Sequence, residues 1–192
     1  MIISHKHKFI TIDIPKTGTT SINNRLRPYL DKGDFTFVMS GEIGMRHSTY
    51  NEVITKFPNY KNYFSFAFVR NPWDRMLSFW FFKKQHAANK IPQNTSLKDF
   101  FSQDKLFKNE LFLDQYSFVK DFGEKSFIGR FENLQEDFDA VCDKIGLPRK
   151  TLLHKNKTNH RYYTEYYDDE THEIIAEKYA RDIDYFGYKF GE

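Results

Sequence analysis

The chain has 192 residues, a net charge of +3 at neutral pH and one cysteine. So small a charge gives no support to nucleic-acid binding, and one cysteine excludes an internal disulfide. No apolar run approaches the roughly 20 residues of a membrane helix, and residues 1–8 lack the apolar segment of a signal peptide. We therefore expect one domain over residues 1–192, located in the cytoplasm and without a membrane partner.

The first predicted strand ends in a small polar loop. Residues 9–14 are mostly apolar and β-branched, which is typical of a strand buried in a parallel sheet. Pro15 ends the strand because it cannot donate to a sheet ladder, and Gly18 lets the backbone turn tightly. A helix beginning near Ser21 follows, with Ile22, Leu26 and Tyr29 on its apolar face. Strand, loop and helix N-terminus together favour an anion, above all a phosphate.

The loop differs from the nucleotide P-loop. That motif, G-x-x-x-x-G-K-[ST], needs two glycines before its lysine, whereas here Lys16 precedes the only glycine of the loop. Two interpretations stay open at this point: a phosphate-binding loop of another kind, or a strand–turn–helix whose lysine is merely solvated.

The middle of the chain predicts two more strands and two helices. Residues 35–39 form the second strand, and a glycine-containing loop over 40–47 leads to a helix over 49–57 with capping-box spacing. Residues 63–69 form the strongest strand, which ends at Arg70. Pro72 suits the first position of a helix. That helix carries an apolar stripe of Trp73, Met76, Leu77, Trp80 and Phe81.

The remaining elements complete an α/β pattern. We expect a polar loop over 86–95, a short helix from Ser96, a helical piece over 109–118, a short strand over 126–129, a helix after residue 133, a last helix over 169–179 and a docked tail over 183–188. Cys142 lies on the apolar face of its helix and is read as a packing residue. Strands separated by helices predict a mainly parallel sheet with right-handed crossovers, and ligands bind at the carboxyl ends of such strands.

A second motif follows the strongest strand. Residues 70–78 read R-N-P-W-D-R-M-L-S, so an arginine stands at the strand end and a serine two turns into the next helix. The guanidinium is a rigid fork of donors that suits phosphate. Taken alone, Arg70 is better explained by a surface ion pair. Both motifs in this order are more specific than either one.

The two motifs together resemble a known family. The order P-K-T-G-T-T-S at 15–21 is similar to the 5′-phosphosulfate loop of sulfotransferases that use 3′-phosphoadenosine 5′-phosphosulfate (PAPS), and R-x-P-x-x-R-x-x-S at 70–78 is similar to their 3′-phosphate segment. The resemblance continues through Gln115, through R-F-E-N-L and D-F at 130–138, and through Y-x-x-D and F-G-Y at 179–188. Within the family, the chain resembles carbohydrate sulfotransferases of the heparan-sulfate 2-O- and chondroitin type, but it is short and we expect no membrane anchor.

The resemblance implies a fold, a donor and its binding residues. It implies a P-loop-NTPase-like three-layer α/β fold with a mainly parallel central sheet flanked by helices. The donor would be PAPS and the product PAP, with no metal. The 5′-phosphate would be bound by Lys16, Thr17, Gly18, Thr19, Thr20 and Ser21, and the 3′-phosphate by Arg70 and Ser78. Arg130 either approaches the 3′-phosphate or pairs with a carboxylate such as that of Glu132.

Catalysis is expected to rest on Lys16 and His47. Lys16 would stabilise the leaving oxygen, and His47 would take the proton of the acceptor hydroxyl, since an imidazole titrates near neutrality. The alternative for His47 is a polar residue that only flanks a helix, with Glu42 as the substitute base. Arg46 would hold an anionic acceptor. Lys155 and Asn156 lie in a basic segment that either contacts the acceptor or nucleotide or is simply solvated.

The predicted reaction is sulfuryl transfer by in-line displacement to a hydroxyl, expected on a carbohydrate. One alternative is a non-catalytic PAPS or PAP binder, in which Lys16, Arg70 and Ser78 keep their roles and His47 has none. A nucleotide-dependent kinase is disfavoured by the missing G-K-[ST] and by the lack of an acidic magnesium ligand after a strand. The sequence leaves the acceptor and the oligomeric state open.

Overall fold

The structure, a computed structural model, describes residues 1–36, 47–85, 91–103, 110–153 and 161–192. Its contacts divide the chain into two compact units. The first unit comprises Met1–Val69 and Ser117–Lys155, and the second Arg70–Tyr116 and Asn156–Glu192. The expectation of one domain stays a prediction.

The first unit contains the sheet. Within the described residues, five strands pair in the order β3-β1-β2-β4-β5. Their bounds are β1 Ile2–Ser4, β2 Phe9–Ile12, β3 Phe35–Thr36, β4 Phe64–Val69 and β5 Ser126–Arg130. The pairs β2–β4 and β4–β5 are parallel, whereas β1 pairs antiparallel with both β2 and β3. The α/β class with a parallel centre is thus confirmed, and β1 is a strand that the sequence analysis did not predict.

The register aligns the carboxyl ends of the three parallel strands. Ile12 at the end of β2 pairs with Ala67, and Val69 at the end of β4 pairs with Arg130 at the end of β5. The segment after β2 and the segment after β5 therefore begin at the same edge of the sheet, where ligands of parallel sheets bind.

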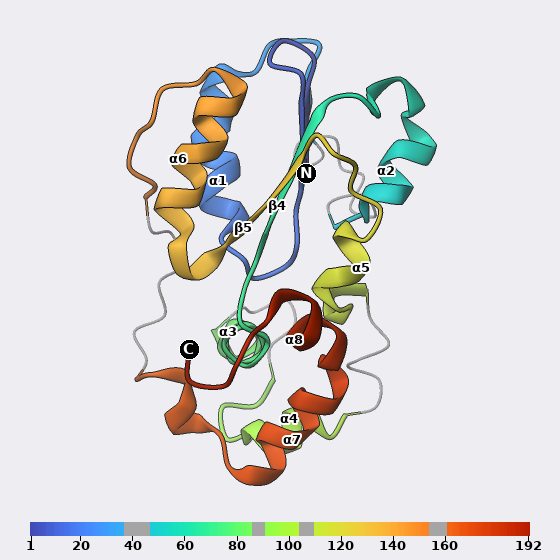
Figure 1. Cartoon of the computed structure of the whole chain (residues 1–192). Coiled ribbons are helices and arrows are strands. Elements are labelled where there is room, and N and C mark those ends of the chain that lie inside the picture. The colour runs from blue at the N-terminus through green and yellow to red at the C-terminus, as the bar shows by residue number, and fades with distance from the viewer. Residues whose placement is uncertain (37–46, 86–90, 104–109, 154–160) are drawn as a thin grey trace. The chain divides into compact units, whose positions relative to one another are not determined.

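Helices cover both faces of this sheet. Helices α1 (Thr19–Leu26) and α6 (Leu134–Ile145) lie side by side on one face, and α2 (Tyr50–Lys56) lies on the other side of the strands (Figure 1). The predicted apolar face of α6 is buried: it holds Leu134, Phe138, Val141, Cys142 and Ile145. These side chains pack with those of α1 and of the strands, including Ile22, Leu26, Phe66 and Phe68. Thr49 caps α2 in the predicted capping box.

The second unit is helical. It contains α3 (Pro72–Gln85), α4 (Leu97–Phe101), α7 (Asp169–Lys178) and α8 (Ala180–Phe186). Helix α5 (Gln115–Val119) begins in this unit and ends in the first. The predicted stripe of α3 contributes Trp73, Met76 and Leu77 to a core with Phe100, Phe112, Ile175 and Tyr179. None of the described helices is long and apolar enough to cross a membrane.

Short 3₁₀ turns link the elements: η1 Arg27–Tyr29, η3 Pro58–Tyr60, η5 Glu110–Phe112, η6 Phe131–Asn133 and η7 Tyr163–Tyr166. The segment predicted as a tail docked by its rings is helical as far as Phe186, and Gly187 ends the helix in the left-handed conformation with φ 67°. Phe186 and Tyr188 are buried, as that prediction required, whereas Tyr185 is exposed.

Gly129 in β5 makes room for a ring of β4. It pairs with Phe68, and a Cβ at this position would lie 2.5 Å from Phe68 Cε1. Because Phe68 is buried, we expect Gly129→Ala to lower the free energy of unfolding by about 1–3 kcal/mol through overpacking. Urea unfolding measures this. Gly123→Ala is the matched control, since nothing lies within 4 Å of its Cβ position. Equal unfolding midpoints for the two variants would contradict the account.

Candidate functional site

The loop between β2 and α1 is built from two residues in the left-handed conformation. Lys16 has φ 69° and Gly18 has φ 83°, and Gly18 is the N-cap of α1. Thr17 is fully buried, and its Oγ1 donates to the carbonyl of Ile14 at 2.9 Å. The Thr17 hydroxyl therefore locks the loop from inside, while Lys16 and Thr20 stay partly exposed.

The first turn of α1 favours negative charge. The amides of Ser21 and Ile22 donate to the carbonyl of Gly18 and start the helix. The first amides of a helix have no acceptor within it, and the first turn of α1 contains no acidic residue. With the partial positive charge of the helix N-terminus, this end suits a phosphate.

Gly18 also packs tightly against the segment that follows β5. A Cβ on Gly18 would lie 2.9 Å from Leu134 Cδ2 and 3.4 Å from Phe131 Cδ2. The apolar residues of the R-F-E-N-L motif, Phe131 and Leu134, therefore pack directly against the loop at Gly18. A glycine is needed here both for its positive φ and for this close approach.

Asp13 anchors the start of the loop, and the sequence analysis did not single it out. Its carboxylate is buried and accepts a hydrogen bond from Asn23 Nδ2 at 2.5 Å and from Thr11 Oγ1 at 3.3 Å. The amino group of Met1 also contacts it. The available signal was a lone carboxylate within an apolar run, which is costly to bury unless it is paired.

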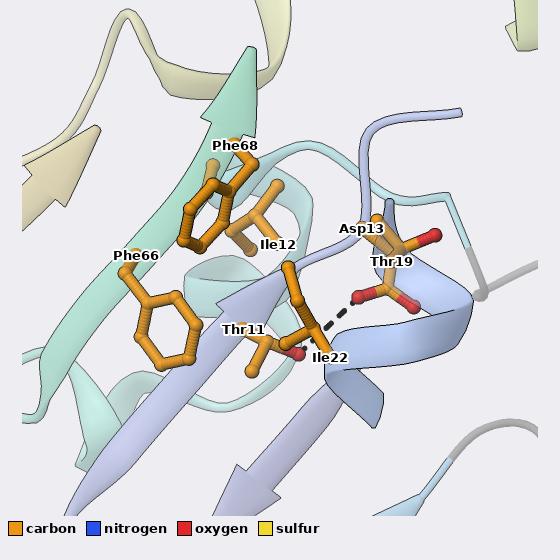
Figure 2. Close-up of a pocket in the computed structure, with 8 residues that line it drawn as sticks. Thr11, Ile12, Asp13, Thr19, Ile22, Phe66 and Phe68 are labelled. Atoms are coloured by element: carbon orange, nitrogen blue, oxygen red, sulfur yellow. Dashed lines mark hydrogen bonds between the residues drawn. The ribbon is translucent and has the colours of Figure 1, made fainter. Parts of the chain in front are cut away.

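A small pocket lies beneath the loop. Figure 2 shows it between β2, β4 and the beginning of α1, with the Thr11–Asp13 hydrogen bond on one side and Phe66 and Phe68 on the other. Its lining residues are Thr11, Ile12, Asp13, Thr19, Ile22, Phe66, Ala67 and Phe68.

His47 lies beside the start of the loop of residues 15–21, called the phosphate-type loop below. Its Nδ1 is 2.7 Å from the carbonyl oxygen of Asp13. Because a carbonyl only accepts hydrogen bonds, Nδ1 carries the proton, and the neutral ring then has its lone pair on Nε2. The end of β2 thus positions both the loop and a basic nitrogen.

Arg130 occupies the end of β5. Its amide donates to Asp137 Oδ2 at 2.6 Å, which ties the strand end to the first turn of α6. This contact explains the aspartate of the R-F-E-N-L…D-F motif. The first unit therefore brings together the loop of residues 16–21, His47 and the R-F-E-N-L segment at one edge of the sheet.

The second motif lies in the second unit. Arg70 is mostly buried, and its Nε and Nη2 contact Asp74 Oδ2 at 2.8 and 2.7 Å. Asn71 Oδ1 accepts from the amide of Trp73 and so caps α3. Ser78 is buried two turns into α3. Arg75 of the motif is fully buried and donates to the carbonyls of Leu111 and Leu113, so its role is structural.

Four candidate residues, Glu42, Arg46, Lys155 and Asn156, lie outside the described residues. Among the residues that are described, no group of three or more histidine, cysteine or acidic side chains could hold a metal ion.

The double constraint on Gly18 predicts an unusually sensitive position. Gly18→Ala should lower the free energy of unfolding by about 2–4 kcal/mol, because left-handed strain adds to overpacking against Leu134. Gly146→Ala isolates the strain, since Gly146 has φ 68° with nothing within 4 Å of its Cβ position, and it should cost about 1 kcal/mol. Urea unfolding compares the two, and a smaller loss for Gly18→Ala than for Gly146→Ala would refute the packing argument.

The hydrogen bond from His47 predicts a tautomer. Nitrogen-15 NMR of the neutral imidazole should show the proton on Nδ1, because that nitrogen donates to the carbonyl of Asp13. His47→Gln assigns the resonance by its disappearance. A neutral ring protonated mainly on Nε2 would mean that this hydrogen bond does not form in solution.

Comparisons with known proteins place the chain in a family. The model of the Sulfotransferase family matches residues 1–189. An uncharacterized protein of Archaeoglobus fulgidus is 32% identical over 97 residues, which is 47% of this chain and 74% of that protein. The crystal structure of mouse sulfotransferase SULT7A1 complexed with PAP has the same fold, with a TM-score of 0.61 and 12% identity over 94% of this chain and 86% of that one. The family match covers nearly the whole chain, and the protein therefore belongs to the sulfotransferase family.

Proposed function

We propose that the protein transfers the sulfuryl group of PAPS to a hydroxyl of a carbohydrate acceptor, with His47 as the base. Family membership supports sulfuryl transfer in general. The observation that carries the proposal further is the hydrogen bond from His47 Nδ1 to the carbonyl of Asp13, because it sets an imidazole beside the phosphate-type loop.

The loop fits the 5′-phosphosulfate of the donor. A left-handed Gly18, a helix start without acidic residues and the partly exposed Lys16 provide amides and one positive charge. The structural neighbour SULT7A1 was solved with PAP, the desulfated form of the same donor. PAPS supplies a sulfuryl group attached to a phosphate leaving group, and in-line transfer from it depends on positioning and charge stabilisation.

Arg70 and Ser78 are proposed for the 3′-phosphate. The guanidinium of Arg70 contacts Asp74 through Nε and Nη2, so its direction is already set. A phosphate would add charge-assisted hydrogen bonds of the kind that arginine forms best. Arg130, at the end of β5, is proposed as a further donor-binding residue.

In this proposal His47 is the general base and Lys16 stabilises the leaving group. With its proton on Nδ1, the neutral imidazole of His47 presents Nε2 as the atom that accepts the hydroxyl proton. As the acceptor oxygen bonds to sulfur, the bond from sulfur to the phosphate oxygen breaks, and the ammonium of Lys16 offsets the charge that grows on that oxygen. Glu42, Arg46, Lys155 and Asn156 remain predictions for acceptor binding, as do the carbohydrate itself and the cytoplasmic location.

Donor recognition is tested by calorimetry. PAP should bind more tightly than ATP, and Arg70→Ala should weaken PAP binding by about 10- to 100-fold, because a charge-assisted hydrogen bond is lost. Arg149→Ala is the control, since Arg149 is exposed and pairs with Asp143. A preference for ATP with magnesium would favour a kinase instead.

The base is tested by transfer of radiolabelled sulfuryl from PAPS to a panel of oligosaccharides. His47→Ala should lower turnover by about 10²- to 10⁴-fold, the usual contribution of a general base, with PAP affinity unchanged. His7→Ala, at the amino end of β2, should leave turnover intact. If His47→Ala turns over normally, the base assignment is wrong. If the wild type binds PAP but sulfates no acceptor, the protein is better described as a PAP binder.

A further inference from the structure

The backbone of Arg70 is held from both sides by one side chain. Arg70 follows the last residue of β4, and its amide donates to Gln115 Oε1 at 2.8 Å. Gln115 Nε2 donates to the carbonyl of Arg70, also at 2.8 Å. The glutamine amide thus satisfies the N–H and the C=O of the same residue, as a neighbouring strand would, and so restrains both backbone dihedrals of Arg70.

Gln115 is held in turn by Asp182 of α8. Gln115 is the first residue of α5. Asp182 Oδ2 accepts from the amide of Gln115 at 2.9 Å and from its Nε2 at 3.2 Å, and Oδ1 accepts from the amide of Tyr116 at 2.8 Å. Gln115 and Asp182 are both fully buried. The carboxylate therefore fixes which way the glutamine amide faces.

The charge of Asp182 is partly compensated. Burial raises the pKa of its carboxyl, and the positive charge of Arg75 together with the amides of Gln115 and Tyr116 acts in the opposite direction. Arg75 is itself fully buried and is fixed by the carbonyls of Leu111 and Leu113. An apolar pair of similar size would fill the same space without these costs, so the arrangement calls for an explanation beyond packing.

We propose that Gln115 and Asp182 are positioning residues for the 3′-phosphate: they set the backbone of Arg70 and thereby aim its guanidinium at that group. The inference rests on the proposed function. The direction of the guanidinium depends on the φ and ψ of Arg70, which the glutamine restrains. Asp74 then fixes the far end of the same side chain through Nε and Nη2. The arginine is thus preorganised at both ends, which lowers the entropy lost when a phosphate binds.

Selectivity between two nucleotides tests this inference. PAP and adenosine 5′-monophosphate (AMP) differ only in the 3′-phosphate. Gln115→Met keeps the side-chain length but removes both hydrogen bonds to Arg70. We expect PAP affinity to fall by about tenfold or more, with AMP affinity almost unchanged, so that the ratio of the two dissociation constants collapses. Calorimetry measures both constants.

A merely structural role would leave that ratio intact. Phe100→Leu is the matched control, since Phe100 is buried in the same unit and belongs to its core. It should lower the melting temperature while keeping the selectivity. If Gln115→Met does not fold, Asp182→Asn takes its place, because it puts an amide in the position of a carboxylate that accepts N–H groups.

The outcomes separate the inference from the proposed function. Collapse of the ratio in a folded variant of Gln115 or Asp182 supports the inference. A wild-type ratio retained in such a variant overturns it and leaves the donor site standing. A wild-type protein that binds PAP no better than AMP overturns the 3′-phosphate assignment itself, and the inference with it.

Discussion

The parallel pairing of β2 with β4 is the constraint on which the rest depends. Its register, with Ile12 opposite Ala67, brings the carboxyl ends of the two strands to the same edge of the sheet. The chain leaves β2 through Asp13 into the loop that starts α1, and it leaves β4 directly into Arg70. A shift of one residue would turn every inward side chain of these strands outward. Burial of Phe9, Ile10, Phe66 and Phe68 therefore fixes the register of β2 and β4, and with it the position of the residues that follow each strand.

The same arrangement occurs in each unit: groups proposed for chemistry are positioned through the main chain. The carbonyl of Asp13 holds the ring of His47, and the carboxylate of Asp137 holds the amide of Arg130. Gln115 holds both main-chain groups of Arg70. Because strand ends have backbone groups that the sheet no longer pairs, buried polar side chains can satisfy them and direct the residue at the same time. This explains why polar residues persist in an otherwise apolar core.

The sequence predicted the helical apolar stripes and the helix N-termini well. The apolar stripes of α3 and α6, the capping box at Thr49 and the short helix from Ser96 appear as expected, because these signals are local. β1 was missed because a three-residue strand has no period of its own and depends on its partners β2 and β3. Asp182 was also missed as a positioning group, since its hydrogen bonds join residues far apart in the chain. Asp13 was missed because its partners Thr11 and Asn23 share no periodic or capping pattern with it. The family motifs identified Gln115, but they did not predict its role. Its hydrogen bonds to the backbone of Arg70 are tertiary contacts between residues far apart in the chain.

A crystal structure of the protein with PAP tests the central claim most directly. We expect the 5′-phosphate on the amides of residues 16–21 with Lys16 in contact, and the 3′-phosphate on Arg70 and Ser78. The hydrogen bonds from Gln115 to Arg70 should be preserved in the complex. PAP bound elsewhere, or a 3′-phosphate that contacts neither Arg70 nor Ser78, would contradict the assignment of the donor site.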